Sequence, residues 1–366
     1  MNYKFLKRLP VVLLFVSAIH STINGQMNSI DRLLASPMEY IVLKTEETIV
    51  IDGKDNEKEW SRASWTTLFT DIVTGELDGV ANETRAKMLW DKDFLYLYVI
   101  MEESDIWASL TEHDSSVFQD NAFEIFIDPD GDTHNYFEIQ FNAYGTVWDL
   151  FMSKPYRNGG QSLSSWDVKG LQKAIHINGT LNDPKDKDNN WSIELAIPFN
   201  SIKMNSDKKP QNGVIWRMNL SRVDWDLDVI NGKYQRKRYE DTRKLLPAHY
   251  TVWSPQGIVN LHYPERYGYI LFSEKISSSS FFSHDIKTSK LLLWKYYYLQ
   301  QEYKTEAGRY ATTIGELKKL YPEIADEEDE SKICMDATDY QFRVQTISSS
   351  KNFAIDEQGE VREHSE

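Results

Sequence analysis

Two short stretches in the middle of the chain, Ala122–Ile127 and Tyr136–Asn142, place a large apolar side chain at every second position. These alternating residues are Phe123, Ile125 and Ile127 in the first stretch and Phe137, Ile139 and Phe141 in the second. A period of two residues is typical of β-strands whose two faces differ. The polar loop DPDGDTHN joins the stretches and Thr146–Phe151 follows them, so we predict an antiparallel meander here.

The chain up to residue 272 repeats short strand-like segments. Phe94–Glu102 is apolar on both alternating faces, which favours a strand inside a sandwich or barrel. Further strands are predicted at Thr48–Asp52 and Thr66–Phe69, whereas the charged segment Asp224–Lys244 is predicted to be a surface loop. Aromatic residues make up 13% of the sequence, and such side chains fit a pleated, half-buried surface. We therefore predict a mainly β fold, an antiparallel β-sandwich.

The C-terminal part has a different pattern. Lys287–Ala307 carries apolar residues at helical spacing, and Thr312–Leu320 is a second predicted helix with Thr313 as its N-cap and Glu316 three residues later. Two strands are predicted after these helices, at Tyr340–Gln345 and Phe353–Ile355, so this part is predicted to be a small α+β module. The predicted organisation is a signal peptide at 1–25, an N-terminal lead at 26–44, the sandwich at 45–273, a linker at 274–286 and the module at 287–366.

Charge and cysteine content limit the classes of partner. The formal net charge of −15 argues against nucleic acid and against anionic membrane surfaces, because both are bound by clustered Lys and Arg. The basic start and the short apolar run Val11–Ile19 have the layout of a secretory signal peptide, with cleavage expected before Gln26. Cys334 is the single cysteine, so no internal disulfide is expected. We expect a secreted or periplasmic protein, not held in the membrane after cleavage.

The loop between the two central stretches carries a candidate metal site. Asp128, Asp130 and Asp132 place a carboxylate at every second residue, with Gly131 available for a tight turn. Calcium takes six to eight oxygen ligands, so alternating Asp residues in a loop suit it. The alternative is a plain polar hairpin loop. The pattern is not an EF-hand, because the Glu at loop position twelve is missing.

Two further sets of residues bear on carbohydrate chemistry. Trp107 and Trp253 occur in loop-like sequence and could stack on the apolar face of a sugar, or could instead be buried anchors. Glu124 and Glu138 lie on neighbouring predicted strands and could share a face, which is the pairing that a glycosidase needs. No feature of the sequence marks one of these acids as buried and the other as exposed, so we do not favour catalysis.

Several motifs, taken in order, carry a resemblance to a known family. They are IDGKDNEKEW, WDKDFLYLYVIMEESDIW, DNAFEIFIDPDGD and WSPQGIVNLHYPERYGYILF. Together they resemble the family 9 carbohydrate-binding modules and their exported bacterial relatives. The resemblance implies a DOMON-like β-sandwich that binds oligo- or polysaccharide without catalysis, with structural calcium. It also implies a sugar held between two Trp rings with polar partners, for which the matching residues are Trp107, Trp253, Arg222, Glu124 and Asn121.

Alternatives remain at this point. DOMON relatives also hold haem between Met and His, and this chain offers Met88, Met101, Met152, His113 and His134 as ligands. A glycoside hydrolase using Glu124 is a further alternative. The C-terminal module weakly resembles the soluble part of type II secretion pseudopilins, and we expect it to contact a protein partner.

Overall fold

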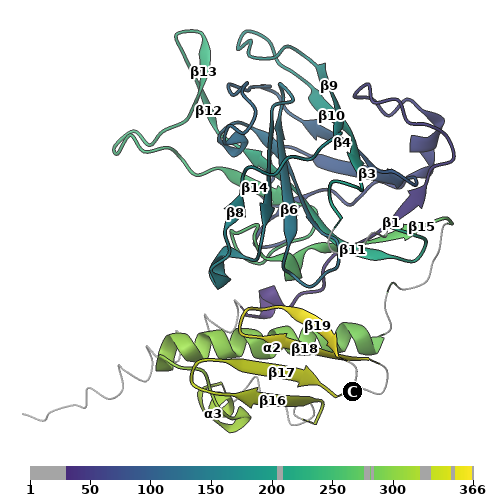
Figure 1. The fold of residues 1–366 in the computed structure, drawn as a ribbon. Helices are drawn as coiled ribbons and strands as arrows, with labels where there is room; N and C mark the ends of the chain where they lie inside the picture. The colour runs from purple at the N-terminus through teal and green to yellow at the C-terminus, as the bar shows by residue number, and fades with distance from the viewer. Residues whose placement is uncertain are drawn as a thin grey trace, which may run out of the picture.

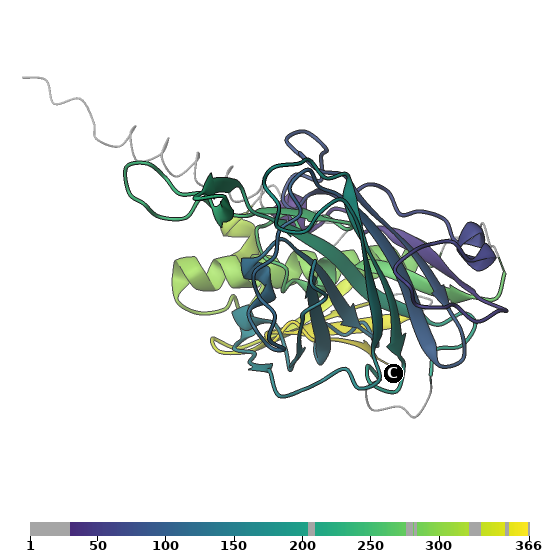
Figure 2. The same ribbon diagram turned by 90° about the horizontal axis from the view of Figure 1, so that it is seen from above.

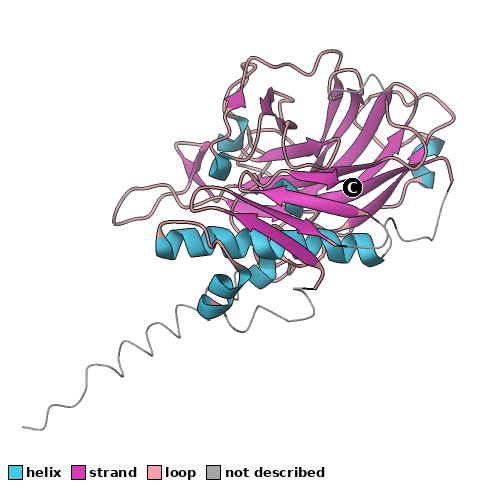
Figure 3. Cartoon of the chain, turned by 60° about the horizontal axis from the view of Figure 1, so that its bottom comes forward, coloured by secondary structure: helices cyan, strands magenta, loops and turns pink. Residues whose placement is uncertain are grey.

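The computed structural model describes residues 30–203, 209–275, 281, 284–321, 331–347 and 351–364. The predicted signal peptide and much of the predicted linker lie outside these residues. The described chain is mainly β, as predicted, with the long helix confined to the C-terminal part (Figure 3). The sandwich strands are β1 (Glu39–Lys44), β2 (Thr70–Asp71), β3 (Thr84–Trp90), β4 (Phe94–Glu102), β5 (Ala122–Asp128), β6 (Tyr136–Asn142), β7 (Val147–Met152), β8 (Ser162–Leu163), β9 (Gln172–Asn178), β10 (Asn190–Pro198), β11 (Ile215–Asp224), β14 (His249–Val252) and β15 (Gly268–Ser273).

These strands form one curled sheet whose two halves face each other across a core (Figure 1). The strand order is β8-β7-β6-β5-β11-β15-β1-β3-β4-β10-β9, with β14 and β2 joined to β11. The described strands pair antiparallel, except that β1 runs parallel to both β15 and β3. Four short 3-10 helices occupy the connections: η1 (Lys58–Arg62), η2 (Val117–Gln119), η3 (Tyr156–Asn158) and η4 (Pro264–Arg266).

The predicted meander is confirmed as β5, β6 and β7. The odd-numbered side chains of β5 and β6 enter the main core, which they share with β3, β4, β10 and β11. Ile125 lies opposite Ile139, and Phe123 lies opposite Phe141. Since side chains alternate across a strand, the even-numbered residues of the same strands must lie on the other face of the sheet. That outer face becomes important for the functional site.

Other boundaries differ from the sequence predictions. The lead at 26–44 is not separate from the body, because it supplies β1. Thr48–Asp52 and Thr66–Phe69 are not strands, although Thr66 and Phe69 donate backbone hydrogen bonds to β3. The segment Asp224–Lys244 is not a plain loop: it contains a hairpin of β12 (Leu227–Ile230) and β13 (Lys233–Arg236), which projects from the sandwich in Figure 1.

The C-terminal module is α+β, as predicted. Its sheet has the order β16-β17-β18-β19, and helix α2 packs on β17 and β18. Its elements are α2 (His284–Ala307), α3 (Ile314–Leu320), β16 (Ile333–Ala337), β17 (Phe342–Thr346), β18 (Asn352–Asp356) and β19 (Val361–His364). The predicted N-cap is confirmed, because Thr313 Oγ1 accepts a hydrogen bond from the Glu316 backbone N–H at 3.3 Å.

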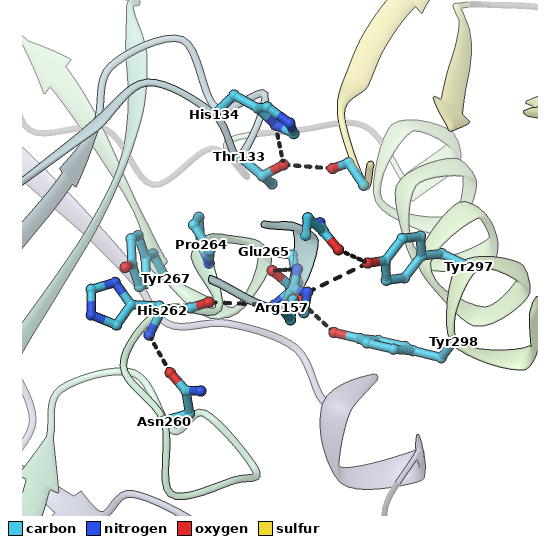
Figure 4. A network of polar contacts seen from close by, with 12 residues as sticks. Thr133, His134, Arg157, Asn260, His262, Pro264, Glu265, Tyr267, Tyr297 and Tyr298 are labelled. Carbon is cyan, nitrogen blue, oxygen red and sulfur yellow. Dashed lines mark hydrogen bonds and ion pairs between the residues drawn. The ribbon is translucent and has the colours of Figure 1, made fainter. Parts of the chain in front are cut away.

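The module docks directly on the sandwich of its own chain (Figures 1 and 2). In Figure 4, Arg157 and Glu265 of the sandwich meet Tyr297 and Tyr298 of α2. Arg157 Nη2 donates to Glu265 Oε2 at 2.9 Å, and the Tyr298 hydroxyl donates to Glu265 Oε1. At a second point, Thr133 Oγ1 donates to the Gly359 carbonyl at 2.5 Å.

Candidate functional site

The outer face of β5, β6 and β7 carries an unusual set of polar side chains. Glu124 of β5 lies opposite Gln140 of β6, which in turn lies opposite Trp148 of β7. Glu138 lies beside them on the same face of β6. Each of these residues alternates with a core residue, so the strand geometry that builds the core also places Glu124, Glu138 and Gln140 on the outer face. We call these three residues the polar row.

This polar row forms the floor of a cavity of about 350 Å³, which we call the aromatic pocket. Its walls come from the loops around the floor and are mainly aromatic. The lining residues outside the floor include Phe118, Trp148, Tyr156, Tyr250 and His262. The rings of Phe118 and Trp148 lie 5.5 Å apart at an interplanar angle of 35°, and Tyr156 packs edge-on to His262 at 4.6 Å.

The two acids of the floor, Glu124 and Glu138, keep their protons to a higher pH than exposed carboxyls do. Burial raises the pKa of Glu124 to about 8, and the nearby Glu138 adds to this effect. Burial also raises the pKa of Glu138 to about 7, against a hydrogen bond that Gln140 Nε2 donates at 2.6 Å. Glu124 Oε2 is buried without a hydrogen-bond partner among the described residues. The pocket therefore holds a polar atom whose hydrogen-bonding capacity is unused.

A larger and more acidic hollow of about 590 Å³ adjoins the aromatic pocket and shares Ile72, Tyr250 and Val259 with it. Glu103 and Asn121 line this hollow, and Asn121 Nδ2 donates to Glu103 Oε1. Arg222 lies beneath, fully buried, with Nη2 donating to Glu103 Oε2 at 3.1 Å and Nε donating to Asp224 Oδ1 at 3.0 Å. Burial raises the pKa of Glu103 to about 7, and Arg222 opposes that shift.

The structure thus brings three of the predicted sugar-binding residues to adjoining parts of one surface. Glu124 belongs to the aromatic pocket, Asn121 lines the acidic hollow, and Arg222 supports that hollow from below. Arg222 is 1% exposed and does not line the hollow itself, so its contact with the hollow runs through Glu103 and Asp224, which do.

Of the two readings of the Trp pair, the structure favours buried anchors over sugar stacking. Trp253 is 2% exposed and belongs to the main core cluster, where its ring packs edge-on to Tyr40 at 6.3 Å. Trp107 is also buried, at 8% exposed, and lines neither cavity. A loop aromatic can be buried when the loop folds over the core, and a ring enclosed in this way offers no face to a sugar.

The ring that sequence reasoning missed is Trp148. It lies on the polar face of a predicted strand, one residue from Asp149, and is partly exposed. The available signal was its position, because Trp148 lies opposite Gln140 and so falls on the face away from the main core. Phe118 and Tyr250 come from distant segments, so only the fold brings them to the pocket.

The predicted calcium ligands Asp128, Asp130 and Asp132 do come together, with one carboxylate oxygen of each within 4.8 Å of the others. Asp128 is fully buried, and its two oxygens accept the backbone N–H groups of Gly131 at 2.9 Å and Thr133 at 3.0 Å. Burial, and then the charges of Asp130 and Asp132, raises the pKa of Asp128 well above its usual range. The concentration of negative charge fits a cation, although Asp128 has part of its acceptor capacity in use.

The haem alternative gains no support from the positions of its ligands. Met88 and Met101 lie in the main core, and Met152 lies in a separate buried cluster. His134 is nearly buried beside the Asp132 loop, whereas His113 is exposed among acidic residues. Neither cavity described above is lined by any of these three methionines.

The curled sandwich with a polar, aromatic-walled cavity on its outer face defines the class of protein: a β-sandwich with the features of a binding module. The family model described as "Carbohydrate family 9 binding domain-like" matches residues 51–234, half of the chain. The chain therefore belongs to this family.

Similar proteins were found among larger enzymes and among solved structures. The chain is 27% identical over 206 residues to exoglucanase XynX of Acetivibrio thermocellus, and 26% identical over 194 residues to endo-1,4-beta-xylanase A of Thermoanaerobacterium saccharolyticum. These matches cover 56% and 52% of this chain but only 15% and 13% of the two enzymes. A family 9 carbohydrate-binding module of Caldicellulosiruptor kristjanssonii, solved with glucose, is 16% identical with a TM-score of 0.41, over 66% of this chain and 98% of that one.

Proposed function

We propose that this chain is an exported, non-catalytic carbohydrate-binding protein whose sugar site is the aromatic pocket. The observation that carries the proposal is the outer face of β5–β7, where Glu124, Glu138 and Gln140 lie in register beside Trp148. Sugars combine apolar C–H faces, which stack on aromatic rings, with hydroxyls that need directed donors and acceptors. The pocket supplies both within one cavity.

In this proposal the floor and the wall have separate tasks. Trp148, supported by Phe118, provides the stacking surface. The unpartnered oxygen of Glu124 receives or donates a hydrogen bond to a sugar hydroxyl, which removes the cost of a buried unsatisfied polar group. The adjoining acidic hollow, held in place by Arg222 and Asn121, extends the site for a second sugar unit.

The test is a glycan array followed by titration calorimetry with the best ligand. Trp148→Ala should weaken binding at least about tenfold, because truncating a central aromatic contact typically costs at least about 2 kcal/mol. Trp65→Ala is the matched control, since Trp65 is also partly exposed but packs beside Tyr98 and does not line the aromatic pocket. Unchanged affinity in Trp148→Ala, or equal loss in both variants, would contradict this site.

The two acids of the aromatic pocket also allow a test of whether the protein is an enzyme. Glu124 and Glu138 share a face, as a glycosidase would need, yet burial raises the pKa of both, so neither is set apart as a permanently ionised partner. We expect no reducing sugar to be released from the polysaccharides that bind. Release that Glu124→Gln abolishes would identify the protein as an enzyme.

We also propose that the Asp128–Asp132 loop binds calcium for structure. Three clustered carboxylates favour a hard cation with oxygen ligands, with water or main-chain carbonyls completing the shell. A ligand that binds only the folded state stabilises it, so EDTA should lower the melting temperature and calcium should restore it. Asp130→Asn, at an exposed position, should weaken that dependence. A melting curve unmoved by EDTA and calcium would leave the loop a polar hairpin.

Export remains a proposal, because the signal-like residues lie outside the described part of the chain. Among the described residues, no helix has the length and apolarity needed to cross a bilayer. An N-terminal sequence that begins at Gln26 in protein recovered from the periplasm or medium would support export. Full-length protein retained in the cytoplasm would contradict it.

A further inference from the structure

Four potential metal ligands meet at the surface of the sandwich, away from the Asp128–Asp132 loop. His113 and Asp114 come from the loop between β4 and β5, Asp149 comes from β7, and Asp167 follows β8. One ligand atom of each lies within 4.8 Å of the others. The group is not apparent in the sequence, because its residues come from three separate segments and have no metal-binding spacing.

The distances from the His113 ring nitrogen to the three carboxylates are close to those between ligands of a small divalent cation. From His113 Nε2, the distances are 3.0 Å to Asp167 Oδ1, 3.6 Å to Asp114 Oδ1 and 3.7 Å to Asp149 Oδ1. Zinc bonds of about 2.0–2.2 Å in a tetrahedron separate the ligand atoms by roughly 3.3–3.6 Å. The three distances from His113 are thus close to those around one ion, and the carboxylate oxygens lie within 4.8 Å of one another.

Asp149 supplies an independent indication of a missing ligand. Its side chain is completely buried, and Oδ2 accepts the Val168 backbone N–H at 2.6 Å. Oδ1, the atom directed at the group, has no hydrogen-bond partner among the described residues. His113 approaches this oxygen at 3.7 Å, too far for a hydrogen bond. A buried carboxylate oxygen without a partner is costly, and a bound cation would remove that cost.

We propose that His113, Asp114, Asp149 and Asp167 bind a divalent first-row transition-metal ion, for which Zn²⁺ is the best match. Calcium takes oxygen ligands, whereas an imidazole nitrogen together with carboxylates suits zinc and its neighbours. The ion would tie the β4–β5 loop and the segment after β8 to β7. Such a link would act as a clamp in a chain whose single cysteine, Cys334, is free.

The metal site is separate from the proposed sugar site. Asp149 and Trp148 are adjacent on β7, so their side chains lie on opposite faces of the sheet. A failure of sugar binding would therefore leave this proposal intact, and the reverse also holds.

The alternative is that a protonated His113 is itself the counter-ion for the three acids. The hydrogen bond to Asp167, together with the charges of Asp114 and Asp149, raises the pKa of His113, against the effect of burial. That arrangement would bind no metal and would weaken as His113 loses its proton at high pH. Metal binding has the opposite dependence, because the imidazole nitrogen must be unprotonated to act as a ligand.

The test uses the full chain after treatment with a chelator. Zn²⁺ is titrated by calorimetry at pH 6 and pH 8, and Co²⁺ is added separately so that its visible spectrum reports coordination. We expect a Zn²⁺ site that binds more tightly at pH 8, and a Co²⁺ spectrum typical of low coordination number. Ca²⁺ titration should show no competition at this site.

His113→Ala and Asp149→Asn should each weaken zinc binding at least about tenfold, since even outer-shell changes cost 10–100-fold in metal affinity. His113 is exposed, so its replacement leaves the core unchanged. His249→Ala is the matched control, because His249 is also exposed and lies 3.5 Å from Asp226. Zinc affinity unchanged in His113→Ala, equal loss in His249→Ala, or tighter binding of Ca²⁺ than Zn²⁺ at this site would each overturn the proposal.

Discussion

Glu124 illustrates how strongly one side chain depends on the face of the strand that it occupies. Its neighbours Phe123 and Ile125 point into the core, whereas Glu124 lies on the outer face and is covered by the walls of the aromatic pocket. Burial raises its pKa to about 8. Because an unfolded Glu ionises near pH 4.3, Glu124 binds a proton more tightly in the folded protein than in the unfolded chain.

This shift predicts a pH dependence of stability. Between about pH 4.5 and pH 8 the unfolded chain loses the Glu124 proton while the folded protein retains it, so stability should fall as pH rises through this window. One such group contributes a slope of at most about 1.4 kcal/mol per pH unit. Glu124→Gln, which cannot ionise, should flatten the fall. Melting temperatures of the unchanged protein and of Glu124→Gln, taken from pH 4.5 to 8.5, measure this fall in stability. Parallel curves would show that Glu124 is ionised in the folded protein.

At the scale of elements, the sequence predicted β4 and β6 with their boundaries, because β6 has a period-two pattern and β4 is a continuous apolar run, both bounded by turns. It missed β12 and β13, whose charged residues hide the alternation, and β1, whose strand was assigned to a lead. The site was only partly predictable. Glu124 and the Asp128–Asp132 loop follow from local sequence, whereas the burial of Trp253 and the exposure of Trp148 depend on which segments cover them.

Helix α3 is short enough for its first turn to decide its stability. Thr313 accepts the Glu316 N–H, and the Glu316 carboxylate accepts the Thr312 N–H at 2.8 Å and pairs with Arg309 at 2.9 Å. Thr313→Ala should lower the free energy of unfolding by about 0.5–2 kcal/mol, the usual cost of losing an N-cap. Thr312→Ala should cost less, because its backbone N–H bond survives. Urea unfolding of both variants distinguishes these outcomes, and equal losses would show that the cap is unimportant.

At the scale of the whole molecule, the C-terminal module and the sandwich form a continuous structure. The start of the described chain contributes to this contact, because Ile30 belongs to the hydrophobic core of the module. The hydroxyl of Thr133, which follows the proposed calcium loop, donates a hydrogen bond to the Gly359 carbonyl. The Val361 N–H donates to the Asp132 carbonyl at 3.1 Å. One partner of the module is therefore the sandwich itself, and contact with another protein stays a prediction.

Tyr298 offers the sharpest test of how far this docking stabilises the molecule. Its hydroxyl donates across the interface to Glu265, a carboxylate that is buried and already paired with Arg157. Tyr298→Phe removes a hydrogen bond to a charged acceptor, so we expect a loss of about 1.5–3 kcal/mol in the free energy of unfolding. Tyr321→Phe is the matched control, because Tyr321 is buried in the same cluster and its hydroxyl has no partner among the described residues.

The control should be neutral or slightly stabilising, since it removes an unsatisfied buried hydroxyl. Calorimetric melting of the full chain gives a second readout. If the interface couples the two parts, Tyr298→Phe should lower the melting temperature of the module more than that of the sandwich, which broadens or splits the transition. Tyr321→Phe should leave a transition of the same shape. Because both variants remove one oxygen from a buried ring, a difference between them reports the bond to Glu265 rather than the change in packing. Superimposable curves for the two variants would mean that the module and the sandwich are joined without energetic coupling through Glu265.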